Sequence, residues 1–129
     1  MPPDTLVQWN CRGFSANFHD IQLLKQDYNP VAFCLQETYL NDKSSCSLRQ
    51  YDMYHAPSID TERATGGSAI FIRNGTVHNH IPLNTRLQAV AVRITLSFVF
   101  TLCSVYIPPS SSLSASDLQT LVDQLPKPF

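Results

Sequence analysis

The hydrophobic and polar positions in the first quarter of the chain predict a strand, an amphipathic helix and a second strand. Residues 6–11 form a short strand-like run. From Asn17, a residue type favoured at helix N-caps, apolar side chains recur at helical spacing as far as Tyr28, and Asn29-Pro30 marks the end. Residues 31–35 are continuously apolar, as in a strand covered on both faces. This order forms a βαβ unit, so we expect two parallel strands whose carboxyl ends meet at one edge.

Later apolar runs predict short strands separated by turns, at residues 51–56, 67–73, 77–81, 87–94 and 98–107. Asn74-Gly75 is a pair typical of two-residue hairpins, so we expect the strands on either side of it to pair. The last run is apolar on both faces, which predicts a central strand. Gly66-Gly67 precedes a strand rather than a helix, so we expect a turn with close backbone packing and not a phosphate-binding loop.

A second helix follows a serine-rich loop. Residues 116–119 have the pattern of a capping box, apolar residues continue at helical spacing to Leu125, and Pro126 ends the run. A helix after a central strand should lead into another strand, and a sheet that is apolar on both faces needs a further covering layer. We therefore expect residues 1–129 to form a single partial domain, the N-terminal part of a larger one.

Composition favours one globular domain. The chain has 129 residues, of which 43% are hydrophobic and 15% are charged, and its formal net charge is −1. These values exclude an intrinsically disordered chain and a strongly basic nucleic-acid-binding tail. A near-neutral chain has no long-range field that attracts a polyanion, so any contact with DNA must be local and must depend on a few groups and a metal ion.

Cysteine usage and hydropathy bear on the cellular compartment. Cys11, Cys34, Cys46 and Cys103 form no C-x-x-C pair, so we expect reduced structural thiols rather than a zinc site or a disulfide framework. The sequence has no run of about 18 apolar residues, and its first residues lack the layout of a signal peptide. We expect an intracellular protein without a membrane partner.

Three polar residues stand at the ends of predicted strands. Asn10 and Glu37 follow the two parallel strands, where a parallel sheet places its ligand site. A carboxylate there suits a hard cation such as Mg²⁺, which takes one or two carboxylates together with water and substrate phosphate. Tyr106, near the end of the last strand, can supply a phenol to the same cleft. Each residue also has a structural interpretation, as a solvated strand end or a half-buried aromatic.

The combination of these motifs is more specific than its parts. In order and spacing it resembles the endonuclease/exonuclease/phosphatase family, and within it the apurinic-type endonuclease domain of non-LTR retrotransposons, including Jockey-like elements. The motifs are VQWNCRG at residues 7–13, LQET at residues 35–38, GGSAIFIR at residues 66–73 and SVYIPP at residues 104–109. The resemblance implies a DNase I-like fold, a four-layer α/β/β/α sandwich of which this chain is the N-terminal part, truncated before the second sheet is complete.

The resemblance also implies roles for the strand-end residues. Glu37 matches the Glu that binds Mg²⁺, or Mn²⁺, on the scissile phosphate. Asn10 matches the Asn that helps to organise the metal and phosphate site. Tyr106 matches the Tyr whose hydroxyl contacts the phosphate or stabilises its developing charge. The implied activity is target-site nicking of DNA, in the nucleus, by an element whose polyprotein also carries a reverse transcriptase.

The resemblance implies that the C-terminal half of the domain is absent, because the family pattern continues beyond the second predicted helix. The Gly-Asp-Phe-Asn and Ser-Asp-His motifs are missing, and none of the four histidines, His19, His55, His78 and His80, lies in a Ser-Asp-His context. His78 and His80 alternate along one predicted strand, where we expect a solvent-facing pair. We therefore expect the chain alone to be inactive.

Three alternatives stay open. The first is a phosphodiesterase or phosphatase of the same superfamily with another substrate. The second is a catalytically dead remnant, and the third is an unrelated small α+β domain whose Glu and Tyr are structural. Clustering of Asn10, Glu37 and Tyr106 along one cleft is the feature that separates the nuclease hypothesis from the last alternative.

Overall fold

The computed structural model describes residues 3–40, 47–56, 66–108 and 112–129. Its helices and strands are, in order, β1 (Leu6–Asn10), α1 (Phe18–Tyr28), β2 (Ala32–Gln36), β3 (Tyr51–Ala56), β4 (Ser68–Arg73), β5 (Val77–Ile81), β6 (Gln88–Thr95), β7 (Val99–Tyr106) and α2 (Ala115–Val122). The strands form a first sheet in the order β1-β2-β4-β3 and a second sheet in the order β5-β6-β7.

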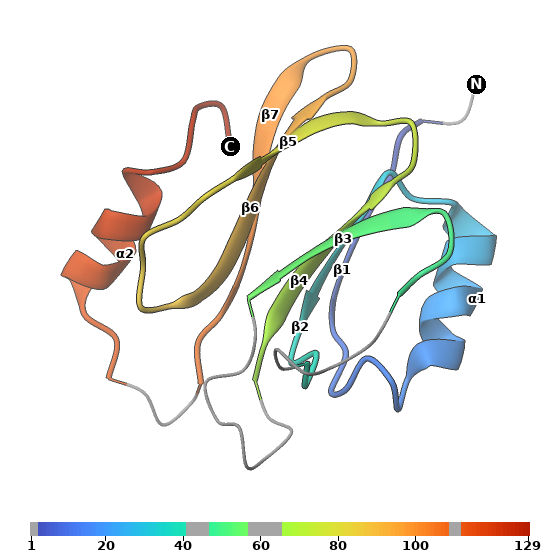
Figure 1. Cartoon of the computed structure of the whole chain (residues 1–129), viewed down its shortest axis with the longest axis horizontal. Helices are drawn as coiled ribbons and strands as arrows, with labels where there is room; N and C mark the ends of the chain where they lie inside the picture. The colour runs from blue at the N-terminus through green and yellow to red at the C-terminus, as the bar shows by residue number, and fades with distance from the viewer. Residues whose placement is uncertain (1–2, 41–46, 57–65, 109–111) are drawn as a thin grey trace.

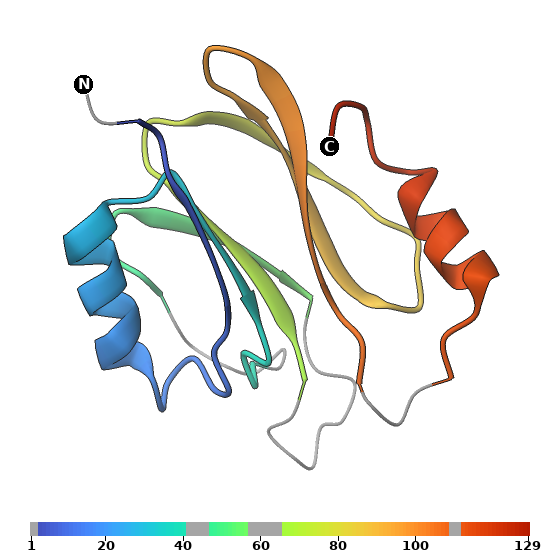
Figure 2. The same ribbon diagram turned by 180° about the vertical axis from the view of Figure 1, so that it is seen from behind.

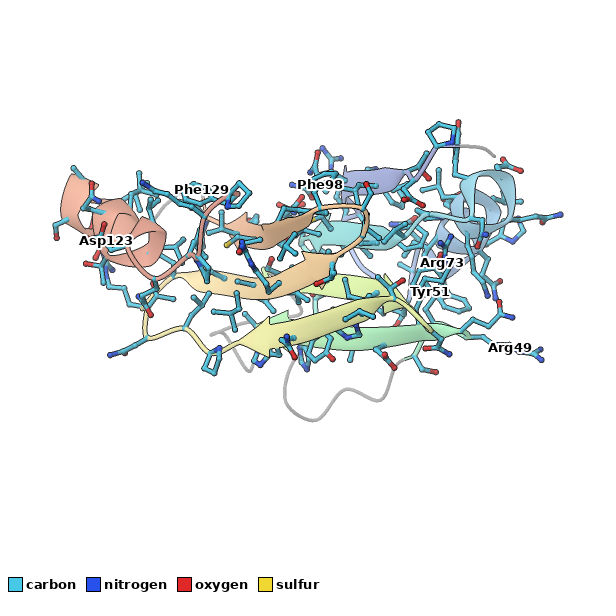
Figure 3. The ribbon with its side chains drawn as sticks, turned by 90° about the horizontal axis from the view of Figure 1, so that it is seen from above. Arg49, Tyr51, Arg73, Phe98, Asp123 and Phe129 are labelled. Carbon is cyan, nitrogen blue, oxygen red and sulfur yellow. The ribbon has the colours of Figure 1, made fainter. Side chains whose placement is uncertain are left out.

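The two sheets are stacked between the two helices. Figures 1 and 2 show α1 on the outer side of the first sheet and α2 on the outer side of the second. Viewed from above, α1 and α2 lie at opposite ends, with Asp123 marking the end of α2 (Figure 3). Strands β2 and β4 contact β7 across the interface between the sheets. This arrangement confirms the α/β/β/α layers expected for a DNase I-like fold.

The predicted βαβ unit is confirmed. β1 and β2 pair in parallel, with Asn10 opposite Gln36 at their carboxyl ends. Asn17 is the N-cap residue of α1, but its side chain accepts no hydrogen bond from the helix. Instead, the Asn17 amide donates to the carbonyl of Cys11 at 2.6 Å, which ties the start of the helix to the end of β1. Asn29 closes α1 in the left-handed conformation, with its N–H donating to the Lys25 carbonyl.

Two hydrophobic cores lie on the two faces of the first sheet. Phe33, Leu35 and Phe71 face α1, where they pack with Ile21. The alternate positions of β2 and β4 face the second sheet, where they pack with Val92 and its neighbours on β6. Because successive strand residues point to opposite faces, a strand buried on both faces must be apolar at every position. This explains the unbroken apolar run of β2.

The hairpin predicted at Asn74-Gly75 is wrong in its pairing, although the turn is present. The Thr76 N–H donates to the Arg73 carbonyl at 3.1 Å, and Gly75 has a φ of +89°. However, β4 pairs with β2 and β3, whereas β5 pairs with β6. Both edges of β4 are thus occupied within the first sheet, so the turn carries the chain from the first sheet to the second.

The prediction that residues 98–107 form a central strand is also wrong. Within the described segments β7 pairs only with β6, which is the middle strand of the second sheet. One face of β7 is apolar because Phe100 and Leu102 pack against the first sheet. Its outer edge meets the C-terminal segment, where the Thr101 N–H donates to the Pro128 carbonyl at 2.8 Å. Only Thr101 and Ser104 of β7 are buried, so the apolar residues on its two faces do not mark a central strand.

α2 opens with a capping box that lies earlier than the predicted one. The Ser114 hydroxyl accepts from the Asp117 N–H at 3.1 Å, and the Asp117 carboxylate accepts from the Ser114 N–H at 3.3 Å. Arg86 holds the same carboxylate through its Nε, at 2.9 Å from Oδ1. This ion pair helps to hold Asp117 as the third residue of the helix, whereas the predicted capping box placed Gln119 there. The helix ends at Val122, before the predicted stop at Pro126.

The structure describes three of the four cysteines. Cys11, Cys34 and Cys103 are free, and the first two are buried. Burial raises the pKa of Cys34 and of Cys103 to about 11. Cys46 lies outside the described residues. Within those residues, no helix has the length and apolar character needed to cross a membrane.

Candidate active site

Glu37 directly follows β2 and has a backbone conformation that few residues other than glycine adopt. Its φ is +53°, in the left-handed region, which costs a non-glycine residue about 1–2 kcal/mol. Two loop hydrogen bonds hold this conformation: the Gly13 N–H donates to the Glu37 carbonyl at 2.7 Å, and the Phe14 N–H donates to the Thr38 carbonyl at 2.8 Å. The segment between β1 and α1 therefore fixes the backbone position from which the Glu37 side chain extends.

Tyr106 ends β7 and contacts Glu37 from the second sheet. Its hydroxyl donates to Glu37 Oε1 at 3.0 Å, and both side chains are half-buried. Figure 1 shows β2 and β7 running toward the same edge of the sandwich. Burial raises the pKa of Tyr106, and the hydrogen bond to Glu37 raises it further, because both disfavour the phenolate. The phenol is therefore protonated, and a hydrogen-bond donor, at neutral pH.

Asn10 lies at the same end of the first sheet but does not join this contact. It is the exposed last residue of β1 and lies opposite Gln36, which precedes Glu37. The Cys11 N–H donates to the Gln36 backbone carbonyl at 2.9 Å, so the parallel pairing of β1 with β2 continues to the residue before Glu37. Within the residues that the structure describes, the Asn10 side chain makes no hydrogen bond to Glu37 or Tyr106.

A chain of polar side chains connects the two sheets beside the site. The Gln8 side-chain amide donates to Gln36 Oε1 at 2.5 Å, and Gln36 Nε2 donates to the Ser104 hydroxyl at 2.8 Å. Ser104 is 2.6 Å from the Ser68 hydroxyl on β4. Ser68 and Ser104 are both buried. Sequence reasoning did not identify these residues, although Ser104 shares a face of its strand with Tyr106.

The donor set bears on whether a divalent cation fits. Glu37 offers a carboxylate of which one oxygen accepts from Tyr106, and Asn10 offers an amide oxygen at the adjacent strand end. Across the described residues, no group of three or more His, Cys, Asp and Glu side chains could hold a metal ion. One carboxylate and one amide fit Mg²⁺, which prefers oxygen donors and keeps several water ligands, and do not fit a zinc centre.

The histidines of β5 do not contact the site. The side chain of His78 is only 11% exposed and its Nε2 lies 2.8 Å from the Tyr54 hydroxyl, so the prediction of a solvent-facing pair is wrong for this residue. His80 is exposed and stacks on the ring of Tyr54, with the ring centroids 5.1 Å apart. The prediction fails for His78 because this side chain packs against Tyr54 of β3, in the other sheet. The alternation of residues along β5 does not show such a contact.

Solved structures with a similar fold include endonuclease domains and other catalytic domains. One is described as the endonuclease domain of TRAS1, a telomere-specific non-LTR retrotransposon, with a TM-score of 0.69 and 19% identity over 95% of this chain and 52% of that chain. The AP endonuclease LMAP from Leishmania major gives a TM-score of 0.60 and 16% identity over 92% and 43%. The Xenopus laevis APE2 catalytic domain gives a TM-score of 0.57 and 16% identity over 92% and 50%.

The chain thus spans about half the length of these solved structures. A sequence search found no match among curated proteins. The sequence profile of the Endonuclease/Exonuclease/phosphatase family matches residues 7–126, from within β1 to beyond α2. With nearly its whole length matched and with the expected layers in place, the chain belongs to the endonuclease/exonuclease/phosphatase family.

Proposed function

We propose that this chain is the metal-binding half of a Mg²⁺-dependent DNA endonuclease that nicks target DNA for a non-LTR retrotransposon, with Mn²⁺ as a possible substitute ion. The hydrogen bond between the Tyr106 hydroxyl and Glu37 carries the proposal, because it joins two of the three predicted site residues from different sheets at one edge. Similarity to the TRAS1 endonuclease domain supports DNA as the substrate.

In this proposal the three residues have separate roles. Glu37 holds the cation through the carboxylate oxygen that Tyr106 leaves free, and Asn10 supports the same ion or the phosphate from the end of β1. The cation, when bound, neutralises charge on the phosphate oxygens. Tyr106 stays protonated because its pKa is raised, so its hydroxyl can donate to a phosphate oxygen as negative charge develops there.

The proposed site also needs groups that the described residues do not place beside it. His78 is hydrogen-bonded to Tyr54 and to the Thr76 carbonyl, and no described histidine makes a hydrogen bond to Glu37 or Tyr106. We propose that a second half of the domain supplies the base and further metal ligands, and that a reverse transcriptase domain uses the nicked DNA in the nucleus. The chain alone should therefore bind metal weakly and turn over very slowly.

Two measurements with Glu37→Gln test the proposal. The substitution removes the charge but keeps an oxygen that can accept from Tyr106, so the fold should survive. Asp27→Asn, an exposed carboxylate change on α1, is the matched control. In electron paramagnetic resonance titrations of the chain with Mn²⁺, we expect Glu37→Gln to abolish binding and Asp27→Asn to leave it unchanged.

The second measurement is nicking of supercoiled plasmid with Mg²⁺ by residues 1–129 joined to the second half of a family domain. We expect Glu37→Gln to lower the nicking rate by about 100-fold or more. Equal nicking by Glu37→Gln and the unmodified sequence would refute the proposal. Release of phosphate from small phosphomonoesters without nicking would favour a phosphatase, and a joined protein without any turnover would favour an inactive remnant.

A further inference from the structure

Gln88, a buried residue of β6 that no part of the proposed chemistry uses, lies next to the site. It is 7% exposed and lies directly opposite Tyr106 in the pairing of β6 with β7. Directly opposite residues of antiparallel strands share one face of the sheet, so Gln88 and Tyr106 both point toward the first sheet. Tyr106 reaches Glu37, whereas Gln88 reaches the peptide group between Gly66 and Gly67.

This single peptide group forms hydrogen bonds on both of its sides. Its N–H, from Gly67, donates to Gln88 Oε1 at 2.5 Å, and its carbonyl, from Gly66, accepts from the Tyr39 N–H at 2.9 Å. Tyr39 is only two positions beyond Glu37 in the sequence. The peptide therefore relays a contact from Gln88, in the second sheet, to the segment that carries Glu37.

Only glycine fits in this relay. A Cβ on Gly66 would lie 2.7 Å from Gln88 Oε1, and a Cβ on Gly67 would lie 2.5 Å from the Thr38 hydroxyl. The backbone φ is +70° at Gly66 and +92° at Gly67, in the left-handed region. The turn is thus packed closely between Gln88 on one side and the Glu37 segment on the other, as the Gly-Gly pair predicted.

The segment that carries Glu37 needs such support. Both Glu37 and Tyr39 have positive φ, of +53° and +60°, and a strained backbone persists only where its surroundings fix it from several directions. The segment before α1 holds it from one side, through the Gly13 and Phe14 N–H groups. Gln88, through the Gly66–Gly67 peptide, holds it from the side of the second sheet.

We propose that Gln88 is a positioning residue that keeps Glu37 within hydrogen-bond distance of Tyr106. The inference rests on the proposed function for the importance of Glu37, and it adds a residue that acts through the backbone without touching substrate or metal. Losing the Gln88 oxygen should release the Gly66–Gly67 peptide, then the Tyr39 N–H, and so let the Glu37 carboxylate move away from the phenol.

The test is Gln88→Met, which keeps the length of the side chain and removes the acceptor. Tyr54→Phe is the matched control, because it also removes a hydrogen bond between the two sheets, that of the Tyr54 hydroxyl with His78. Tyrosines labelled with ¹³C at Cζ report each phenol titration by NMR, and Tyr106→Phe assigns the signal. We expect the Tyr106 pKa to fall toward that of an unperturbed tyrosine in Gln88→Met and to stay unchanged in Tyr54→Phe.

An unchanged Tyr106 pKa in a folded Gln88→Met chain would overturn the inference. If that variant does not fold, amide hydrogen exchange in the unmodified chain decides. Gly67 and Tyr39 should then be protected and should exchange at similar rates, because one peptide group carries both of their hydrogen bonds. Free exchange at Tyr39 would overturn the inference.

This test is separable from that of the proposed function. In the joined protein, Gln88→Met should lower the nicking rate by about 10-fold or more, since small displacements of a reacting group are costly, while Tyr54→Phe should not change it. Normal nicking by Glu37→Gln would refute the proposed function, whatever the Tyr106 pKa is in Gln88→Met. A Tyr106 pKa that does not change in Gln88→Met would refute the positioning role, whatever substrate the protein cuts.

Discussion

Ser104→Ala is the substitution whose cost follows most directly from the contact between the sheets. Ser104 is 1% exposed, and its hydroxyl lies 2.8 Å from the Gln36 side-chain amide and 2.6 Å from the Ser68 hydroxyl. It also lies 3.3 Å from the Leu35 carbonyl. Alanine removes this central group and leaves its partners in place between the two sheets, where Ser68 is also buried.

The magnitude depends on what each partner can do afterwards. Ser68 is fully buried, so its hydroxyl bears the whole cost of a lost partner, about 1–3 kcal/mol. Gln36 is half-buried and keeps its contact with Gln8, so its cost is smaller. Together we expect the free energy of unfolding to fall by about 2–4 kcal/mol, a large part of the roughly 5–15 kcal/mol typical of a domain.

Urea unfolding followed by circular dichroism measures this cost. With a slope of about 1–3 kcal/mol per molar urea, the midpoint should fall by roughly 0.7–4 M. Ser116→Ala, a change at an exposed position of α2, should stay within about 0.5 kcal/mol of the unmodified chain. The double variant Ser68→Ala/Ser104→Ala should be more stable than the sum of the single changes implies, by about 1 kcal/mol. A loss below about 0.5 kcal/mol for Ser104→Ala, or strict additivity, would refute the reasoning.

Three further outcomes follow from the capping box, the thiols and the glycine turn. The hydrogen bond from Arg86 holds the pKa of Asp117 well below its usual range, so the folded chain binds fewer protons than the unfolded one. Asp117→Asn should therefore lower the urea midpoint at pH 7. The difference in midpoint between this variant and the unmodified chain should shrink as the pH falls below the ordinary aspartate range. Cys34 and Cys103, with pKa values of about 11, should react with a thiol reagent at pH 8 far more slowly in the folded chain than in urea, once Cys46→Ser has removed the fourth thiol; equal rates would contradict the raised pKa values. Gly67→Ala should destabilise the chain by about 1–3 kcal/mol, because φ is +92° and the new methyl would meet a threonine hydroxyl; an unchanged thermal midpoint would contradict the geometry.

The local part of the fold could be predicted from the sequence, and its long-range pairing could not. The βαβ unit follows from the change of hydrophobic period between β1, α1 and β2. Asn74-Gly75 correctly predicted a turn, but a turn motif specifies only the local chain reversal. Which strand β5 pairs with depends on whether the edges of β4 are free, and β2 and β3 already occupy both.

The candidate site shows the same division. Glu37 and Tyr106 could be singled out because polar residues at strand ends interrupt apolar runs, but their contact depends on how the two sheets are stacked. Gln88 and Ser104 could not be singled out, since a lone polar residue in a strand has the same pattern whether it faces solvent or a buried partner. Their roles appear only when the opposite sheet is present.

The contact between Glu37 and Tyr106 joins residues that are 69 positions apart in the sequence. Contacts of such separation form late in folding, because the entropy of closing a long loop must be overcome first. Neither sheet alone contains the pair, so an intermediate with one sheet formed has no site, and a nascent chain has none until β7 has docked. Any metal binding or catalysis that depends on this contact is thereby confined to the folded protein, in which both sheets have formed and docked.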